Sequence, residues 1–274
     1  MVSALRNIPT TFASHTVSEI DTLLDTIKHE QQVCIPLAIE SGSRAWGFPS
    51  PDSDYDCRFV YIRNQDAYLS LWPERDVIET PLIGDLDVNG WDLGKALKLM
   101  LKGNAVIIEW LRSPVIYQGE ARFRDEFLDL TRRLANRTLI GRHYLHLGER
   151  QRQTYFGDGK QVALKKLFYA LRPAATLRWM RMHEGEAIAP MHFPTLMTEC
   201  APPPDVAMLV GELLLKKAET RELGLGPLPS PIVEFVDYEF SVARARFDQS
   251  RIALTRAAKL EAADFFRATV RRLG

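Results

Sequence analysis

The stretch "ESGSRAWGFPSPDSDYDCRFVYIR", from Glu40 to Arg63, decides how the fold is interpreted. Its first half is a loop with two glycines and two prolines, and residues 54–62 then alternate as in a strand. Residues two apart in a strand point to the same face. We therefore expect Asp54 and Asp56 to present parallel carboxylates, about 7 Å apart at Cα, while Tyr55 faces the other way.

The paired aspartates indicate either a metal site or a polar turn. Two adjacent carboxylates repel each other and are costly to bury unless a divalent cation neutralises them. Mg²⁺ is the first candidate, with Mn²⁺ as an alternative, because Mg²⁺ accepts a few carboxylate oxygens and completes its shell with water and nucleotide phosphates. Aspartate and serine are also common in turns, so the pattern alone leaves both interpretations open.

The residues ahead of the aspartates favour a phosphate site. Gly42 and Ser43 predict a tight turn whose backbone N–H groups and hydroxyl can hold a phosphate. Arg44 adds a cation at the same place. The loop and the strand together therefore predict a site for a metal-bound phosphate.

The rest of the chain divides into an α/β part and a helical part. Further strands are predicted at 33–39, where Pro36 favours an edge position or a bulge, and at 75–80 and 85–91, which can pair as a hairpin. Apolar periodicity and end signals predict helices at 18–31, 92–103, 104–111, 122–136, 138–156, 160–182, 205–219, 230–246 and 251–272. We expect the boundary near 115–125.

Composition is that of an ordinary globular protein, with 46% apolar and 26% charged residues in 274. Neither a signal segment nor a membrane-length apolar run is present, so we expect a cytoplasmic protein. The net charge is zero, but residues 15–92 hold 15 acidic and 5 basic residues, whereas residues 132–181 hold 12 basic and 2 acidic. This asymmetry is explained either by unevenly placed solvated faces or by one half that holds cations and another that holds phosphates.

Three segments carry a family resemblance. "GSRAWGFPSPDSDYDCRF" (42–59) resembles the signature of the DNA polymerase β-like nucleotidyltransferase superfamily, in which an apolar-Gly-Ser pattern precedes Asp-apolar-Asp on a strand. "DVNGWDLGKALKLMLKGNAVIIEWLRSPVIY" (87–117) and "KKLFYALRPAATLRWM" (165–180) look like segments of a nucleotidyltransferase subfamily that is associated in part with RNA-repair genes. The resemblance implies an α+β fold: a catalytic domain (1–120) with a mixed sheet flanked by helices, then a helical phosphate- and acceptor-binding domain (121–274).

The resemblance also implies a third carboxylate on a neighbouring strand. We choose Asp87, with Asp85 on the same face as the alternative, whereas Asp92 is better explained as a helix N-cap. Asp54, Asp56 and Asp87 would then be the catalytic residues and the ligands of two Mg²⁺ ions.

Further positions in the family-like segments are candidate nucleotide contacts. They are Lys102, Asn104, Lys165, Lys166, Tyr169 and Arg172. Each has a structural alternative: a solvated lysine stripe on the first helix, a helix N-cap at Asn104, and interdomain packing on the last helix. Glu109 is either a buried partner for a cation or the polar edge of its helix.

The leading hypothesis is a metal-dependent nucleotidyltransferase that transfers a nucleoside monophosphate from an NTP to a hydroxyl acceptor, with release of pyrophosphate. An RNA end and a protein hydroxyl are the acceptors considered. Two alternatives stay open: a non-catalytic nucleotide- or RNA-binding module, and an antitoxin-like regulator that nucleotidylates proteins.

Overall fold

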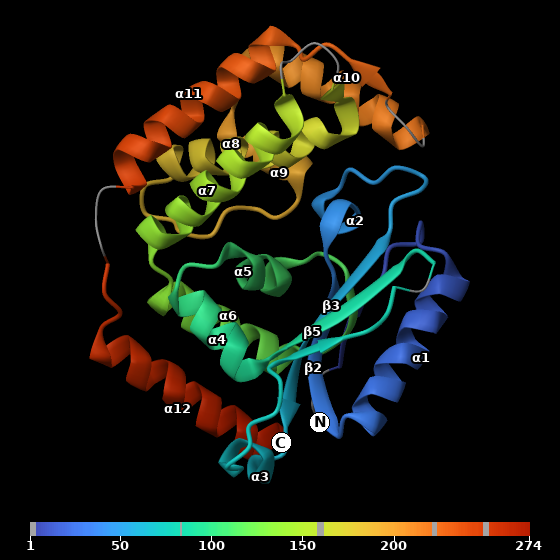
Figure 1. The fold of residues 1–274 in the computed structure, drawn as a ribbon, viewed down its shortest axis with the longest axis vertical. Helices are drawn as coiled ribbons and strands as arrows, with labels where there is room; N and C mark the ends of the chain where they lie inside the picture. Colours follow the sequence, from blue (N-terminus) through green and yellow to red (C-terminus); the bar gives the residue numbers. More distant parts are fainter. Residues whose placement is uncertain (1–3, 83, 158–161, 221–223, 249–251) are drawn as a thin grey trace.

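The computed structural model describes residues 4–82, 84–157, 162–220, 224–248 and 252–274. A mixed sheet lies beside a cluster of helices, so the α+β class predicted from the sequence is confirmed (Figure 1). The strands of this sheet are β1 (Ala4–Asn7), β2 (Val33–Glu40), β3 (Tyr55–Arg63), β4 (Val77–Glu79), β5 (Leu86–Asp92) and β6 (Ile116–Glu120). Their order is β1-β6-β2-β3-β5-β4, and only β3 and β5 pair in parallel.

Helices cover both faces of the sheet and form the second part of the molecule (Figure 1). Those within or directly after the sheet segments are α1 (Ser14–Glu30), α2 (Gly42–Trp46), α3 (Gln65–Leu69), α4 (Leu93–Leu101), α5 (Ala105–Arg112) and α6 (Ala121–Leu134). Those that follow are α7 (Arg137–Phe156), the 3₁₀ turn η1 (Leu164–Lys166), α8 (Leu167–Met182), α9 (Phe193–Cys200), α10 (Pro204–Glu219), α11 (Ser230–Phe247) and α12 (Arg256–Leu273). A small second sheet pairs β7 (Val162–Ala163) with β8 (Leu225–Gly226).

The alternation along β3 sets which side chains reach the site. Tyr55 and Cys57 are buried in the cluster that packs against α1, so Tyr55 faces away from the aspartates as the strand pattern predicted. Val60 and Ile62 point to the opposite face, into the core formed with α4 to α8. Asp56 shares the period of these last two residues, so its carboxylate lies on the helical side of the sheet.

The strand that contains Pro36 occupies a different place from the one expected. β2 is central, between β6 and β3, so the edge position was wrong. The predicted bulge is present, because the register with β3 shifts between Cys34 and Leu37. The missing N–H of proline is thus accommodated inside the sheet by an irregular ladder.

Some predicted boundaries shift and some elements were missed. The first helix begins at Ser14 instead of residue 18, and no side chain caps it. The expected 160–182 helix begins at Leu167, with its first two residues outside the described part of the chain. The helix predicted at 251–272 begins at Arg256, and residue 251 also lies outside the described part. The elements that the sequence did not predict are β1, α2, α3, β6, β7, α9 and β8.

The C-terminal helix returns to the sheet. α12 contacts α4, α6 and β3 and lies beside α4 in Figure 1, and α6 itself packs against β2 and β6. The division into domains at residue 120 stays a prediction. No helix in the described segments is long and apolar enough to span a membrane.

Candidate active site

Two of the three predicted carboxylates come from neighbouring parallel strands, and the third directly precedes one of these strands. Asp56 of β3 is in register with Asp87 of β5, and residues paired in this way point to the same face. Asp54 directly precedes β3 and lines the same cleft as Asp56. Burial raises the pKa of the Asp56 carboxyl, and the negative charges of Asp87 and Asp54 raise it further.

A guanidinium lies between the two paired carboxylates. Arg58 Nη2 donates to Asp56 Oδ1 at 3.1 Å and to Asp87 Oδ2 at 2.6 Å. Its Nη1 donates to the backbone carbonyl of Asp87 at 2.7 Å. The Arg58 side chain is 18% exposed, so this contact is partly shielded from water. Arg58 therefore compensates the acidic pair from within the strand.

A buried carboxyl group on the neighbouring strand β2 binds the backbone of β3. Glu40, at the end of β2, is fully buried, and its Oε1 accepts a hydrogen bond from the Asp56 backbone N–H at 2.9 Å. Its Oε2 accepts a hydrogen bond from the Tyr117 hydroxyl. Burial raises the pKa of Glu40 to about 8, although both hydrogen bonds oppose this shift. Glu40 thus fixes the backbone of the residue whose carboxylate faces the cleft.

The Gly-Ser turn forms the start of α2 and contacts the aspartate strand. Gly42 adopts a φ of +61°, and the backbone N–H of the preceding Ser41 donates to the Asp56 carbonyl at 2.8 Å. Ser43 Oγ donates to Ser53 Oγ at 2.9 Å. The turn is therefore fixed against β3 and against the end of the loop that leads to it.

Arg44 points away from this cleft. Its Nη2 donates to the Ser53 carbonyl at 2.6 Å, and its guanidinium lies over the ring of Tyr55, 3.9 Å from the centroid. Arg44 is not among the described residues that line the cleft. Arg44 therefore holds the loop against the start of β3. This position does not support the phosphate contact predicted for it.

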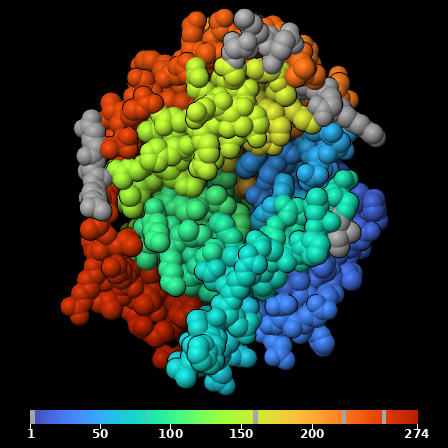
Figure 2. Space-filling model, in the orientation of Figure 1, coloured from blue at the N-terminus to red at the C-terminus, as the bar shows by residue number. Residues whose placement is uncertain are grey.

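The cleft has a volume of about 400 Å³ and lies between the sheet and the helical part. Figure 2 shows the surface hollowed where the blue α2 and β3 region meets the yellow-green helices. The cleft brings together these predicted site residues: Gly42, Ser43, Asp54, Asp56, Lys165, Lys166 and Tyr169. Carboxylates therefore face lysines across one opening.

One lysine of the cleft lies against two aromatic rings, and another is buried. Lys166 Nζ lies 5.1 Å from the ring centroid of Tyr169 and 5.4 Å from that of Tyr155. Lys217 of α10, which the sequence did not single out, is buried, and its Nζ donates to the Phe48 carbonyl at 2.6 Å. Burial lowers the pKa of Lys217 to about 8. The lysines of the cleft thus include one ammonium group from α10, that of Lys217, which follows Lys165 and Lys166 by about 50 residues in the sequence.

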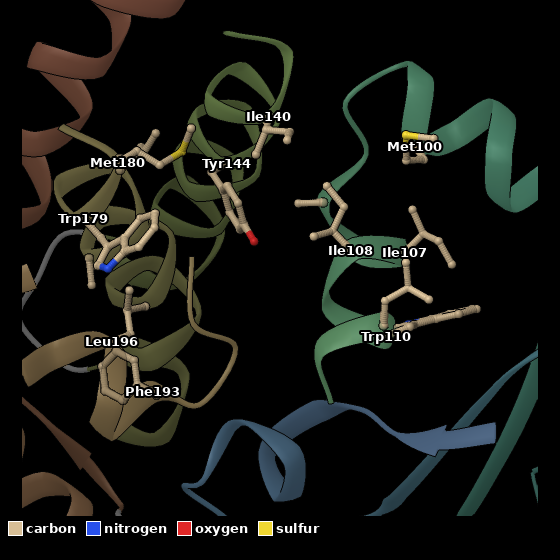
Figure 3. Packing of buried hydrophobic residues seen from close by; sticks show 14 of the residues in the cluster. Met100, Ile107, Ile108, Trp110, Ile140, Tyr144, Trp179, Met180, Phe193 and Leu196 are labelled. Carbon is tan, nitrogen blue, oxygen red and sulfur yellow. The ribbon is translucent and has the colours of Figure 1, made fainter. Parts of the chain in front are cut away.

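Arg172 is placed in the wall behind the cleft. Its guanidinium forms a buried bidentate pair with Glu109, at 2.7 to 2.9 Å, and lies over the ring of Trp46 at 4.2 Å. Tyr144 Oη also donates to Glu109 Oε1 at 2.8 Å, and Figure 3 shows its hydroxyl directed toward α5. Of the two alternatives stated for Glu109, the structure shows the buried partner of a cation. Arg172 also supports Trp46, which lines the cleft.

Lys102 and Asn104 also lie elsewhere. Asn104 caps α5 by accepting a hydrogen bond from the Val106 N–H at 2.8 Å. Lys102 lines a separate pocket between α4 and α12. The N-cap predicted at Asp92 is present, since its carboxylate accepts a hydrogen bond from the Gly94 N–H at 2.7 Å. The structure does not bring Lys102 or Asn104 to the aspartates.

The site is suited to a divalent cation at two of the three carboxylates. Asp54 and Asp56 share the cleft. Burial and, further, the charges of Asp87 and Asp54 raise the pKa of Asp56, so a bound cation would stabilise its charged form. Asp87 is engaged by Arg58. Across the described residues, no group of three or more acidic, histidine or cysteine side chains is assembled for a metal ion.

An acidic strand pair behind a Gly-Ser turn, in a mixed sheet followed by helices, is the arrangement that the resemblance to DNA polymerase β-like nucleotidyltransferases implied. Comparison with known proteins confirms this class. The chain belongs to the RNA repair pathway DNA polymerase beta family, RlaP, whose model matches residues 17–265. It is also similar to the uncharacterized protein YcgL of Bacillus subtilis (strain 168), with 37% identity over 220 residues, which cover 79% of this chain and 84% of the relative. Membership of this family suggests nucleotidyltransferase activity.

Proposed function

We propose that this protein is a metal-dependent nucleotidyltransferase. It would transfer a nucleoside monophosphate from an NTP to a hydroxyl acceptor, which we take to be an RNA end, and release pyrophosphate. The observation that supports this proposal is a single cleft that combines acidic and basic side chains from the two parts of the chain. These are Asp54, Asp56, Lys165, Lys166 and Lys217.

The negative charge that the site has to neutralise during the reaction lies on the triphosphate. The acceptor oxygen bonds to the α-phosphorus, the bond from that phosphorus to the oxygen bridging to the β-phosphate breaks, and pyrophosphate leaves with the electron pair. Three lysines lie across the cleft from the aspartates and would bind the phosphates: Lys165, Lys166 and Lys217. The Ser43 hydroxyl would donate a hydrogen bond to the same phosphates. Catalysis would then depend on positioning and charge neutralisation.

Asp54 and Asp56 would hold Mg²⁺, or Mn²⁺ in its place, with Asp87 as the third carboxylate of a site for two ions. A bound ion of this kind neutralises phosphate charge and orients the attacking and leaving oxygens. Asp87 would accept the proton of the acceptor hydroxyl. Because Arg58 Nη2 donates to Asp87 Oδ2, the guanidinium has to release this oxygen before it can accept that proton.

Incubation of the protein with α-labelled NTPs, Mg²⁺ and a panel of RNA ends tests the proposal. We expect labelled RNA and pyrophosphate from the wild type, and loss of both in Asp54→Asn and Asp56→Asn. Asp66→Asn, an exposed acid on α3, is the matched control and should retain transfer. Transfer that survives both cleft substitutions would refute the assignment.

The same experiment separates the alternatives. Nucleotide binding by calorimetry without pyrophosphate release, with any acceptor, would favour a binding module. Label that enters protein instead of RNA in a cell lysate would favour a protein-nucleotidylating regulator.

A further inference from the structure

We propose that a pocket between α4 and α12 binds a small anion with an apolar body, of the kind represented by a medium-chain carboxylate. The pocket has a volume of about 390 Å³. It lies where α12 returns to the sheet part of the molecule and runs beside α4 (Figure 1). This volume falls within the range of small-molecule sites in proteins.

The floor of the pocket is apolar. The apolar side chains that line it are Leu97, Leu101, Leu254, Ala262, Ala263 and Phe266. Of these, Ala262 is 5% exposed and Leu97 is 4% exposed, so the floor continues into the hydrophobic core. Such a surface favours a ligand with a hydrocarbon or aromatic body.

The only polar side chains among the described lining residues are three lysines: Lys98, Lys102 and Lys259. All three are exposed, and none of them forms an ion pair within the described part of the chain. Lysines can lay their methylene stems along an apolar surface and keep the ammonium in water. Three ammonium groups around one apolar opening therefore favour an anionic head group on the ligand.

Acidic residues of α12 do not compensate this charge. Glu261 pairs with Arg133 of α6 at 2.7 Å, and Asp264 pairs with Arg267. At the start of α4, the N-cap Asp92 accepts hydrogen bonds from the Gly94 N–H and from the Tyr68 hydroxyl. The opening therefore keeps a positive potential that a carboxylate would neutralise.

The pocket is separate from the aspartate cleft. Gly94, which lines the pocket, follows the end of β5, whereas Asp87 lies near the start of that strand. Asp92 lies five residues after Asp87 in the strand, which corresponds to roughly 17 Å. The described lining also contains no amide or hydroxyl side chain to recognise a base or ribose. A carboxylate with a hydrocarbon chain therefore fits this pocket better than a nucleotide does.

Fluorescence titration of the full chain tests the proposal independently of nucleotidyl transfer. The probe is 1-anilinonaphthalene-8-sulfonate, an aromatic anion, and the neutral control is N-phenyl-1-naphthylamine. We expect saturable binding of the anionic probe at one site and its displacement by laurate. Lys98→Glu combined with Lys102→Glu should weaken the anionic probe at least about tenfold and leave the neutral probe bound. Lys216→Glu, an exposed lysine on α10, should change neither.

A second variant tests the position of the ligand. Ala263→Trp would fill the pocket and should abolish both probes, with circular dichroism to verify the fold. Probe binding that is unaffected by both the lysine pair and Ala263→Trp would overturn the proposal. Displacement of the probe by ATP but not by laurate would also overturn it, as would laurate binding seen only on anionic vesicles.

Discussion

Gly42 and the carboxylate of Asp56 are so close that no side chain fits between them. A Cβ atom on Gly42 would lie 2.0 Å from Asp56 Oδ2, and the φ of +61° at Gly42 is one that residues with a side chain rarely adopt. Glycine is therefore required here by the approach of α2 to β3. The same contact fixes the distance between the Gly-Ser turn and the proposed metal ligand.

Gly42→Ala should displace the Asp56 carboxylate. We expect the rate of transfer to fall by about 100-fold or more, because a misplacement of about 1 Å in a catalytic group lowers the rate by this factor. The measurements are nucleotidyl transfer with labelled NTP and the binding of Mn²⁺ followed by calorimetry. Gly84→Ala is the control: Gly84 has a φ of +58° but has nothing within 4 Å of its Cβ position. It should lose some thermal stability and keep activity. Equal activity in the two variants would contradict the positional argument.

Arg58→Ala should make stability depend on divalent cations. Without the guanidinium, the carboxylates of Asp56 and Asp87 face each other across two strands with no cation between them. We expect a loss of roughly 1 to 3 kcal/mol in EDTA, the range for a charged hydrogen bond removed from a partly buried site.

Thermal unfolding of Arg58→Ala with and without Mg²⁺ checks this expectation, because Mg²⁺ should raise its Tm more than that of the wild type. Arg75→Ala removes an exposed ion pair with Glu79 and should change little in either condition. A Tm of Arg58→Ala that equals the wild type in EDTA would show that the bridge is not stabilising.

The sequence predicted β3 well because its pattern is local. Alternation along residues 54–62 and the position of two aspartates sufficed, and the caps at Asp92 and Asn104 were equally readable. β6 was missed because its five residues carry no clear alternation and its strand partners, β1 and β2, lie far away in the chain. Short strands depend on tertiary pairing, which a local pattern does not contain.

The same limit applies to the candidate site. Arg58 lies two residues from Asp56, but its role follows from the parallel register that places Asp87 beside it, and this register cannot be read from spacing. Lys217 comes from α10 and reaches the cleft only through the packing of the helical part on α2. Arg172 was identified by its motif, yet it faces Glu109, because a helix face shared with Lys165 does not determine which side is open to the cleft.

Glu40→Ala should destabilise the protein more than Glu40→Gln. Alanine removes the acceptor for the Asp56 N–H and leaves the Tyr117 hydroxyl without this partner in a buried site, whereas glutamine retains a carbonyl acceptor of the same length. A buried donor without its partner costs about 1 to 3 kcal/mol. Chemical denaturation of both variants measures the difference. Equal free energies of unfolding would mean that the contact with β3 contributes little.

Lys217→Met should weaken NTP binding and remove part of its pH dependence. Burial lowers the pKa of Lys217 to about 8, so the ammonium is present below pH 8 and is lost as the pH rises through that value. At pH 9 only about a tenth of the groups remain charged. If the charged form holds a phosphate, the Kd of the wild type should increase by up to tenfold between pH 7 and pH 9, as roughly one decade of protonation is lost. Calorimetric titration of the metal-loaded protein with NTP at both pH values measures this change.

Lys217→Met should bind NTP more weakly at pH 7, and its Kd should vary less with pH. Lys216→Met, a variant of the exposed neighbour on α10, should follow the wild type. A Lys217→Met variant with the affinity and pH profile of the wild type would remove Lys217 from the phosphate site and leave its hydrogen bond to the Phe48 carbonyl as its only assigned role.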